Sequence, residues 1–428
     1  MIERPKIYKF KGLKTLICRN DNSFSTSCLV LVKTGTDWER KRINGIAHFL
    51  EHLYFKGTKN FPNFRILSEN IEKIGGTFNA FTFYEYTGFY IKVLPDYAKD
   101  ALFILSDIIL NPLFPEEEIE KERKVVLEEI NMKQDDPERL ISDLGINLIY
   151  GDQPAGWPVL GTKESILNIS RKDILNFMKK NYSRKNTLIV VSGKIKNEKE
   201  ILESIKKYFA NYENRKLSKK IKFKKPKNFY QEKIYNKKVE QAHIFIGFPS
   251  KGFVDLKDKV FDFSLFSDAL GGRASSRLFI KLREELGACY CLFSSFNDFT
   301  NRSFLEIRSG LNSQLIKEYI EEIVNELVKI KKGGFNKEEL EISKNQFKSS
   351  LSFNLEDSYS LGLFYGIRYL FKNKIETPLE IYKKIDSVKE DNLKKIANEI
   401  FRFNNTKFVI IAAEGFKNSF SKIFDKLD

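Results

Sequence analysis

Apolar and polar positions follow one another along the chain in patterns that predict both helices and strands. Residues 46–55 are mostly apolar and have the length of a short buried helix, and residues 77–93 contain strand patterns. Two long amphipathic helices and a late strand follow in the same half of the chain. Because helices and strands are mixed rather than strictly alternating, the pattern favours an α+β sandwich of sheet and helices.

The same order of elements occurs twice. The segment FPEEEIEKERKVVLEE, which begins at Phe114 and opens a long helix, resembles FNKEELEISKNQFKSS, which begins 221 positions later at Phe335. The segments YSRKNTLIVVSG from Tyr182 and FRFNNTKFVIIA from Phe401, 219 positions apart, each combine a helix end with a strand. We therefore expect two copies of one domain.

We place the first domain at residues 1–212 and the second at residues 233–428, with a basic linker at 213–232 between them. A chain of 428 residues is too long for one ordinary core, so two domains agree with its length. Its 42% hydrophobic and 14% aromatic residues are sufficient for packed cores. The composition therefore predicts a globular protein.

The sequence predicts a cytoplasmic protein without a membrane partner. No apolar run approaches the roughly 18 residues that span a bilayer, and the start of the chain lacks the hydrophobic core of a signal peptide. The four cysteines include no C-x-x-C pair and fit a reducing compartment, where we interpret them as packing residues: Cys18, Cys28, Cys289 and Cys291.

The net charge of +16 raises the question of nucleic-acid binding. The lysines are spread along the whole chain, however, and they cluster only at residues 216–227. No helical reading motif and no RNA-binding signature accompanies this cluster. A solvated linker is the better interpretation, and we expect no nucleic-acid partner.

The run His48-Phe-Leu-Glu51-His52 holds two of the three histidines of the chain. On a helix His48 and His52 lie about 40° apart, so that both imidazoles can bind one metal ion, and Glu51 falls on the same side. Imidazole nitrogen suits zinc, and a nearby carboxylate can take a proton from metal-bound water. Chance spacing on a solvated helix is the alternative. The apolar flanks argue against it, because buried unpaired His and Glu are costly.

The repeat indicates where the missing third ligand lies. Glu122 and Glu129 of the first copy correspond to Ser343 and Ser350 of the second, and the second copy has no His-x-x-Glu-His run. Carboxylates thus occur where the histidines are, which makes Glu129 or its neighbour Glu128 the candidate third ligand. Glu122, two turns before Glu129, is a second catalytic candidate that could hold a histidine or steer the metal-bound water. An exposed acidic helix remains the alternative for Glu122.

With these residues the chain resembles a known family. His-x-x-Glu-His inverts the usual order of zinc peptidases, and the run from His48 to Thr58 resembles the signature of the pitrilysin and insulinase family of inverzincins, which includes the mitochondrial processing peptidase β subunit. The family's third ligand, 77 positions after the second histidine, corresponds to Glu129. The resemblance covers essentially the whole chain. It implies two homologous sheet-and-helix domains arranged as half of a clamshell.

The resemblance also implies substrate-binding residues. GGTFNAFTFYEYT, from Gly75, is similar to the strand that pairs with substrate backbone in the family, which assigns Asn79 and Ala80 to peptide binding, although plain sheet is an alternative. A segment of the second half resembles the one whose Arg and Tyr reach the substrate, here Arg283 and Tyr290. His243 matches the start of the family's second domain, and we interpret it as a packing residue.

The implied mechanism is zinc-assisted hydrolysis of peptide bonds. One zinc ion per chain, held by His48, His52 and Glu129, lowers the pKa of its bound water, and Glu51 takes the proton and passes it to the leaving amine. The expected substrates are peptides or unfolded polypeptides. Family chains of this length commonly pair, so we expect a homodimer or a heterodimer with a related subunit. The alternative function is a non-catalytic or regulatory subunit of such a heterodimer.

Overall fold

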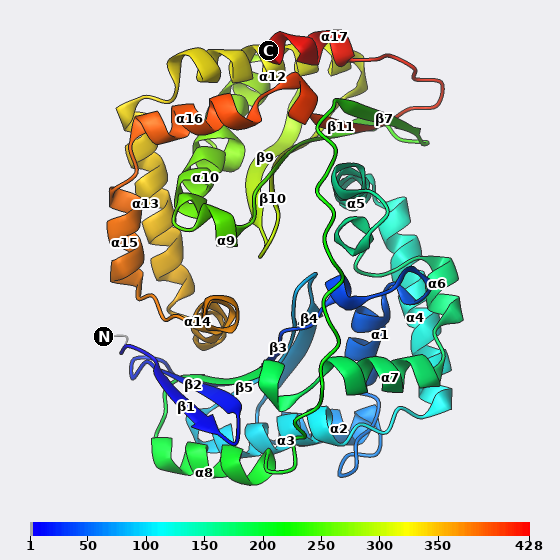
Figure 1. Ribbon diagram of the computed structural model, residues 1–428, viewed down its shortest axis with the longest axis vertical. Helices are drawn as coiled ribbons and strands as arrows, with labels where there is room; N and C mark the ends of the chain where they lie inside the picture. Colours follow the sequence, from blue (N-terminus) through cyan, green and yellow to red (C-terminus); the bar gives the residue numbers. More distant parts are fainter. Residues whose placement is uncertain (1–2) are drawn as a thin grey trace. The chain divides into compact units, whose positions relative to one another are not determined.

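The computed structural model describes residues 3–428, which form two compact units. Unit 1 combines the residues up to Asn131 with Pro158–Lys222 and Leu351–Pro378, and unit 2 combines Met132–Trp157, Phe223–Ser350 and Leu379–Asp428. Each unit is a sheet with helices packed on it, so the predicted α+β class is confirmed (Figure 1). Each unit also contains a segment from the other half of the sequence, which the predicted boundaries do not include.

The sheet of unit 1 has six strands in the order β1-β2-β6-β3-β5-β4. Only the β2–β6 pair is parallel, and β3 is buried along its whole length. The outer strand β4 pairs with β5 on one side, which makes β4 an edge. The strands are β1 (Lys6–Phe10), β2 (Leu13–Arg19), β3 (Thr26–Val32), β4 (Thr77–Thr82), β5 (Thr87–Val93) and β6 (Thr187–Gly193).

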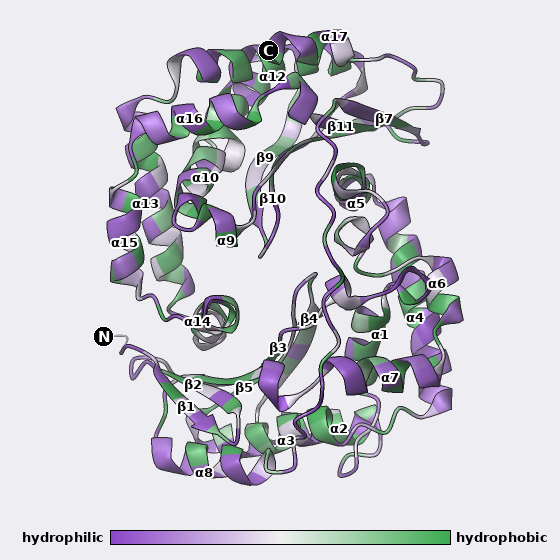
Figure 2. Ribbon diagram, in the orientation of Figure 1, coloured by the Kyte–Doolittle hydropathy of each residue, from purple (hydrophilic) through white to green (hydrophobic). Residues whose placement is uncertain are grey.

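One face of this sheet forms a large core with helices of the first half of the chain. Phe49, Leu50 and Leu53 of the short helix α1 are fully buried there beside Val30 of β3. The mixed colours of α8 in Figure 2 show the amphipathic pattern that such a packing requires. The helices of the first half are α1 (Ile46–Leu53), α2 (Phe64–Lys73), α3 (Ala98–Leu110), α4 (Glu116–Asp135), α5 (Pro137–Tyr150), α6 (Lys163–Asn168), α7 (Arg171–Asn181) and α8 (Glu198–Tyr208).

The other face of the same sheet is covered by α14 (Ser358–Lys372), a helix from the second half of the sequence. Gly362 and Gly366 permit this close approach, because a Cβ atom would lie 2.4 Å from the Ser192 side chain at the first position and 2.6 Å from Leu31 at the second. Asp357 caps α14 and forms an ion pair with Lys92 of β5. The apolar face of one half of the sequence is therefore closed by a helix of the other half.

Unit 2 has a five-stranded sheet in the order β7-β11-β8-β10-β9, in which only β7–β11 is parallel. Helix α5 of the first half packs on it, and a Cβ atom at Gly145 would lie 2.4 Å from the Phe245 ring. The strands are β7 (Gln231–Asn236), β8 (Gln241–Ser250), β9 (Cys289–Asp298), β10 (Ser303–Asn312) and β11 (Lys407–Ala412). The helices are α9 (Phe253–Leu256), α10 (Lys259–Ser267), α11 (Arg277–Phe279), α12 (Ile316–Gly333), α13 (Lys337–Asn354), α15 (Pro378–Asp386), α16 (Glu390–Ile400) and α17 (Ser421–Phe424).

Short helical turns complete the chain. Two of them are π-helices in unit 2, η6 (Asp268–Gly272) and η7 (Ile280–Glu285). The repeat expected from the sequence is visible where α7 leads through a turn into β6 and α16 leads through a turn into β11. The 3-10 turns are η1 (Thr36–Trp38), η2 (Lys41–Ile43), η3 (Pro95–Tyr97), η4 (Pro154–Gly156), η5 (Arg184–Asn186), η8 (Ser313–Leu315), η9 (Phe403–Asn405) and η10 (Asp425–Leu427).

The basic segment between the halves is partly bound to unit 1, which corrects the expectation of a solvated linker. The Ser218 N–H donates to the Lys180 carbonyl at 2.8 Å. The Lys220 ammonium forms ion pairs with the buried carboxylates of Asp37, at 2.7 Å, and Glu85. Two buried acids need a cation, and the linker supplies it.

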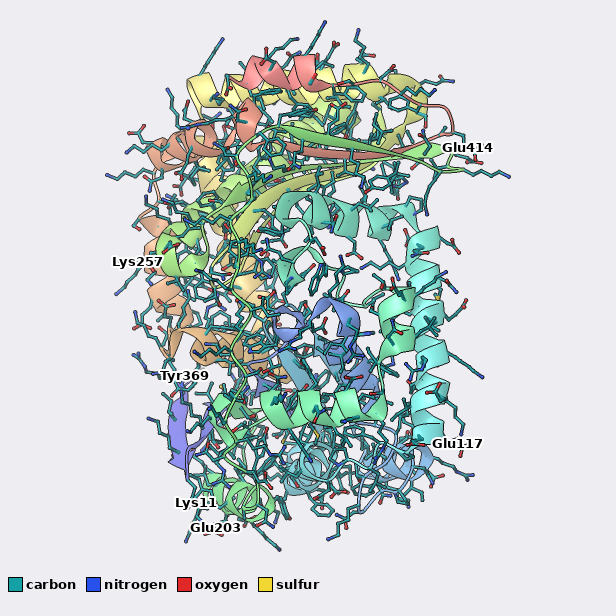
Figure 3. All side chains as sticks on the ribbon, turned by 45° about the vertical axis from the view of Figure 1, so that its right-hand side comes forward. Lys11, Glu117, Glu203, Lys257, Tyr369 and Glu414 are labelled. Atoms are coloured by element: carbon teal, nitrogen blue, oxygen red, sulfur yellow. The ribbon has the colours of Figure 1, made fainter. Side chains whose placement is uncertain are left out.

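Charged side chains are spread over the surface rather than gathered in one helix. Lys11, Glu117 and Glu203, labelled in Figure 3, are exposed charged residues of unit 1.

Among residues 3–428, no helix combines the length and the apolar composition needed to cross a membrane.

Candidate metal centre

Helix α1 begins at a backbone position that requires glycine. Gly45, which precedes the helix, has a φ of 90°, and a Cβ atom there would lie 2.5 Å from the Leu160 carbonyl oxygen. The first N–H groups of the helix donate to Glu39, from Gly45 at 2.7 Å and from Ala47 at 2.8 Å. Glu39 is fully buried. A carboxylate from a preceding turn therefore caps α1, in the place where a side chain at the N-cap itself usually serves.

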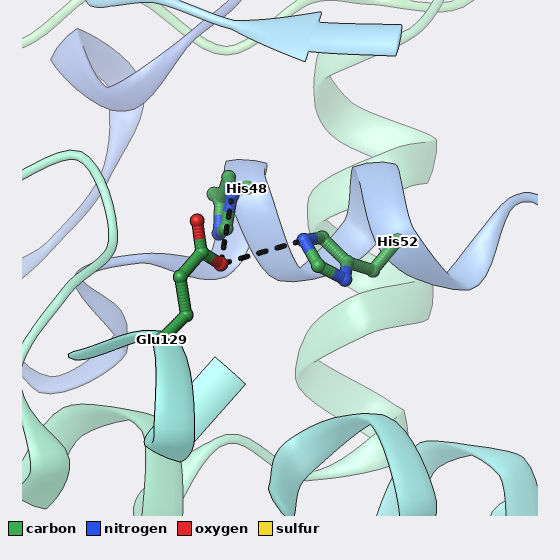
Figure 4. A group of neighbouring side chains, drawn as sticks. All are labelled: His48, His52 and Glu129. Carbon is green, nitrogen blue, oxygen red and sulfur yellow. Dashed lines mark ion pairs between the residues drawn. The ribbon is translucent and has the colours of Figure 1, made fainter. Parts of the chain in front are cut away.

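His48 and His52 of α1 and Glu129 of α4 converge on one point of unit 1. Glu129 Oε2 lies 3.7 Å from His48 Nε2 and 3.8 Å from His52 Nε2, and one donor atom from each residue lies within 4.8 Å of the others (Figure 4). Glu128 is exposed and accepts a hydrogen bond from Asn131. Glu129, and not Glu128, is therefore the carboxylate that faces the histidines.

This group fits a zinc ion. Two zinc–ligand bonds of about 2.0–2.2 Å span at most about 4.4 Å, and both histidine–carboxylate distances are shorter than that. Two imidazoles and one carboxylate form a three-ligand set typical of hydrolytic zinc sites, in which the fourth position is left to water or substrate. His48, His52 and Glu129 would thus hold the ion from two helices.

Glu122 holds His52 from the side opposite to Glu129. His52 Nδ1 lies 3.1 Å from Glu122 Oε2, and because a carboxylate only accepts, this nitrogen carries the proton and leaves Nε2 free to bind a metal. The Lys56 ammonium lies 2.6 Å from the other oxygen of Glu122. Glu122, one of the catalytic candidates, thus contacts a histidine and a lysine, as the first of its two predicted roles requires.

Charges around this group set its protonation. Burial lowers the pKa of His52, but the hydrogen bond to Glu122 and the charges of Glu51 and Glu129 outweigh burial and raise this pKa above its usual value. Burial acts to raise the pKa of Glu122, yet the hydrogen bonds with His52 and Lys56 lower it overall. In the absence of a metal, the His52–Glu122 pair therefore favours imidazolium and carboxylate.

Glu51 lies between the two histidines in sequence and has a different environment. Glu51 as a whole residue is 9% exposed, and burial raises the pKa of its side chain to about 7. The Thr82 hydroxyl of β4 donates to Glu51 Oε2 at 2.5 Å, which acts against this rise. A carboxyl group whose pKa lies near neutrality is suited to take and return a proton.

The edge strand β4 lies beside α1 and carries Asn79 and Ala80. Asn79 is exposed, and its side-chain oxygen accepts a hydrogen bond from the Ala80 N–H at 2.8 Å. The ring of Phe78 contacts that of Phe55, just after α1, with centroids 5.3 Å apart. The two residues assigned to peptide binding are thus at an open sheet edge of the unit that holds the metal group.

Arg283 and Tyr290 lie together in unit 2. The Arg283 guanidinium is 4.9 Å from the centre of the Phe279 ring and 5.3 Å from that of Tyr290. Arg283 belongs to the π-helix η7. Tyr290 is 78% exposed and lies where the β9–β10 register shifts, as β-bulges do when they redirect a side chain. Both residues occupy backbone irregularities of the kind often found at functional sites.

His243, the third histidine, is half-buried in β8 opposite Gly310 and Ile411. Burial lowers the pKa of His243, and this histidine is not part of the metal group of the described residues.

Sequence reasoning missed three polar residues around α1: Glu39, Lys56 and Thr82. Of these three, only Lys56 could have been found from the sequence. It follows His52 by four positions, about one helical turn, so a carboxylate that holds His52, such as Glu122, could have been expected to contact Lys56 as well.

Comparisons with known proteins give consistent matches. A family model described as "Insulinase (Peptidase family M16)" matches residues 14–163, and one described as "Peptidase M16 inactive domain" matches residues 168–347. The chain is 34% identical over 391 residues to the "Uncharacterized zinc protease YmxG" of Bacillus subtilis, which covers 91% of this chain and 94% of that protein. It is 32% identical over 411 residues to an "Uncharacterized zinc protease" of Rickettsia felis, with 96% and 98% covered.

A solved structure agrees with these matches. The crystal structure of a protease from Helicobacter pylori superposes with a TM-score of 0.89 at 26% sequence identity, covering 96% of this chain and 100% of the other.

Proposed function

Because this chain belongs to the insulinase family of peptidases, family M16, we propose that it is a zinc-dependent endopeptidase whose active site is formed by α1, α4 and β4 of unit 1. One observation carries the proposal. Nitrogen atoms of His48 and His52 and an oxygen atom of Glu129 meet within 4.8 Å, beside a buried carboxylate, Glu51, that is not one of the three. Such a set separates metal binding from proton transfer.

Each residue has a distinct role in this proposal. Zinc bound by His48, His52 and Glu129 supplies Lewis acidity toward a carbonyl group and toward water. Glu51 takes a proton from the attacking water and delivers it to the leaving amine, for which a pKa of about 7 is suitable. Glu122 keeps the proton on His52 Nδ1, so that Nε2 points to the metal.

We propose peptides or unfolded polypeptides as substrates, because β4 offers an open edge beside the metal group. An extended peptide can add to such an edge through backbone hydrogen bonds that are independent of its side chains. Peptide addition requires Asn79 to release the Ala80 N–H that it now binds. A folded protein has few extended segments free to pair, so selection for unfolded chains follows.

Three further assignments belong to the proposal. Arg283 and Tyr290 present a guanidinium and a phenol together, which are suited to bind carbonyl groups of a substrate. The chain pairs as a homodimer or with a related subunit, as the family resemblance implies. Four free cysteines agree with residence in a reducing compartment such as the cytoplasm.

A non-catalytic subunit is the second candidate function. The description "inactive domain" supports it for residues 168–347, which exclude every residue of the metal group. Residues 14–163, which contain the group, match the peptidase description instead. The retained His48, Glu51, His52 and Glu129 favour catalysis by this chain.

The test compares the parent protein with Glu51→Gln. We expect one zinc ion per chain in both proteins and cleavage of an unstructured peptide library by the parent alone. Chelation followed by zinc addition should abolish and restore the parental activity. A parent that binds zinc without cleaving peptides would support the non-catalytic subunit, and equal cleavage by Glu51→Gln would exclude Glu51 as the base.

A further inference from the structure

Thr82, the last residue of β4, connects the open edge of the sheet to Glu51. Its hydroxyl donates to Glu51 Oε2 at 2.5 Å. Phe78 and Ala80 pack against the core that contains α1, whereas Phe81 packs against the core beneath α14. Since side chains alternate along a strand, Thr82 shares the α1 face with Phe78 and Ala80.

The backbone of Thr82 faces the other way, toward the open edge. The Phe83 N–H donates to the Tyr86 carbonyl at 2.9 Å, and Thr82 lies opposite Thr87. Hydrogen-bonded and non-hydrogen-bonded pairs alternate along an antiparallel ladder, so the Thr82–Thr87 pair is of the second kind. The N–H and C=O of Thr82 are therefore available to a peptide that adds to β4.

Glu51 depends on this hydroxyl. Among residues 3–428, the Thr82 hydroxyl is the one hydrogen-bond donor to the Glu51 side chain. Glu51 is a buried residue, 9% exposed, so water supplies little compensation. A buried carboxylate that loses its donor is both less stable and free to rotate about its last torsion.

We propose that Thr82 is a positioning residue for the general base, which holds the Glu51 carboxylate through its hydroxyl while its backbone pairs with the substrate. This inference rests on the proposed peptidase function. The threonine hydroxyl fixes one carboxylate oxygen and leaves the other to exchange protons with the attacking water and the leaving amine. Because one residue contacts both base and peptide, the distance from Glu51 to the scissile bond is set by the strand that binds the peptide.

The alternative is that the hydroxyl only stabilises the fold. A structural role predicts that Thr82 variants lose stability and activity together, and that KM and kcat both change. A positioning role predicts a loss confined to kcat. Two substitutions separate the effect of side-chain shape from that of the hydroxyl group. Valine keeps the shape of threonine without its hydrogen-bond donor, and serine keeps the donor without the methyl group.

The experiment measures peptide hydrolysis by zinc-loaded Thr82→Val, Thr82→Ser and Thr82→Ala. For Thr82→Val we expect kcat to fall roughly 10- to 100-fold, the effect of losing a hydrogen bond to a charged group, with zinc content unchanged. KM should stay within about threefold, because the backbone pairing with peptide is retained. Thr82→Ser should return kcat to within a few-fold of the parent. Thr82→Ala, which lacks the donor and has a different shape, should resemble Thr82→Val.

Thr26→Val is the matched control. Thr26, at the start of β3, also donates a side-chain hydrogen bond, to the Lys194 carbonyl, and it is buried. Its loss should change kcat little. A second control measures peptide affinity in the Glu51→Gln background, where adding Thr82→Val should leave the dissociation constant unchanged if Thr82 acts through Glu51.

The possible outcomes distinguish a failure of the proposed peptidase function from a failure of the role of Thr82 alone. A parent protein that shows no zinc-dependent hydrolysis overturns the proposed function and this inference with it. An active parent with a parental kcat in Thr82→Val overturns the positioning role alone. A Thr82→Ser variant as slow as Thr82→Val would assign the effect to shape and also reject the role of the hydroxyl.

Discussion

Helices α4 and α13 are corresponding members of the repeat, and their neighbours differ in charge. In unit 1, α4 presents Glu122 and Glu129 to two histidines of α1. In unit 2, α13 presents at the position of Glu122 the fully buried Ser343, whose hydroxyl accepts a hydrogen bond from Arg273.

Two arginines hold the second cluster together. Arg273 also forms an ion pair with Asp268, and Arg277 pairs with Glu339 through two hydrogen bonds of 2.5 and 2.8 Å. In unit 1 the donor set consists of imidazole nitrogens and a carboxylate, which suit a metal ion. The same architecture thus carries a candidate metal group in one unit and a permanently charged cluster in the other.

Among the variants considered, the largest change from the parent protein should appear when a candidate zinc ligand of unit 1 is removed. His52→Ala should abolish peptide hydrolysis and retention of zinc after dialysis. It should also remove the stabilisation by zinc, which is about 4 kcal/mol when free zinc is a thousandfold above its dissociation constant. Metal analysis and thermal unfolding with and without zinc measure both effects. The control is His243→Gln, and loss of zinc in that variant instead would contradict the assignment.

Breaking the arginine cluster of unit 2 should destabilise the protein without affecting the metal. Arg273→Met leaves the Asp268 carboxylate without its partner, at a cost of about 3 kcal/mol, near the lower limit for buried pairs because Asp268 is partly exposed. Urea unfolding measures this change. Zinc content per folded chain should equal that of the parent, and a reduced content would show that the two clusters are not independent.

Removing the charge of Glu122 should weaken zinc binding and leave unit 2 unchanged. Glu122→Gln keeps the size of the side chain but holds the proton of His52 less firmly, so zinc affinity should fall about 10- to 100-fold. Competition with a chelator measures the affinity. An unchanged affinity would mean that Lys56 and the packing of α1 orient His52 without Glu122.

Acid should release zinc from unit 1. The pKa of His52 is raised in the metal-free state, mainly through Glu122, so zinc must displace a proton from this imidazole. Below that pKa, affinity should fall up to about tenfold per pH unit for each proton displaced. Zinc retention at pH 5.5 and 7.5 tests this sign. The arginines of unit 2 keep their protons throughout this range.

The smallest effect is expected at Ser343. Ser343→Ala removes an acceptor of Arg273 but leaves its ion pair with Asp268, and should cost about 1 kcal/mol in the free energy of unfolding. Chemical unfolding measures it against Ser350→Ala, the change at the position that corresponds to Glu129. A free energy of unfolding equal to that of the parent in Ser343→Ala would show that the buried hydroxyl adds nothing specific.

Local patterns were sufficient to predict much of the fold. The mixed elements and the repeat predicted the α+β class, and the apolar flanks of His48 and His52 predicted a buried α1, which the structure shows. Periodicity did not predict that α14 and α5 would pack with the other half of the sequence. An amphipathic helix shows that it needs an apolar face to cover, but its pattern does not say which face.

Some residues of the candidate site could likewise be predicted from local patterns, and others could not. Helical spacing placed His48, Glu51 and His52 on one side of α1, and the repeat singled out the acidic helix that carries Glu129. Glu39 and Thr82 were missed because their roles depend on contacts with α1 from a preceding turn and from a separate strand. No periodicity links such residues to the histidines they support.

The sequence by itself therefore determined the candidate chemistry of this protein: the types of the candidate ligands, their spacing along one helix and the restriction of the carboxylates to one copy of the repeat. These follow from covalent order and helix geometry, which are local. The tertiary structure showed which carboxylate faces the histidines, a choice that local patterns left open between Glu128 and Glu129, and it alone decided which hydroxyl reaches Glu51. Those choices depend on the packing of α1, α4 and β4, because hydrogen bonds between distant segments form only where burial brings their donors and acceptors within about 3 Å.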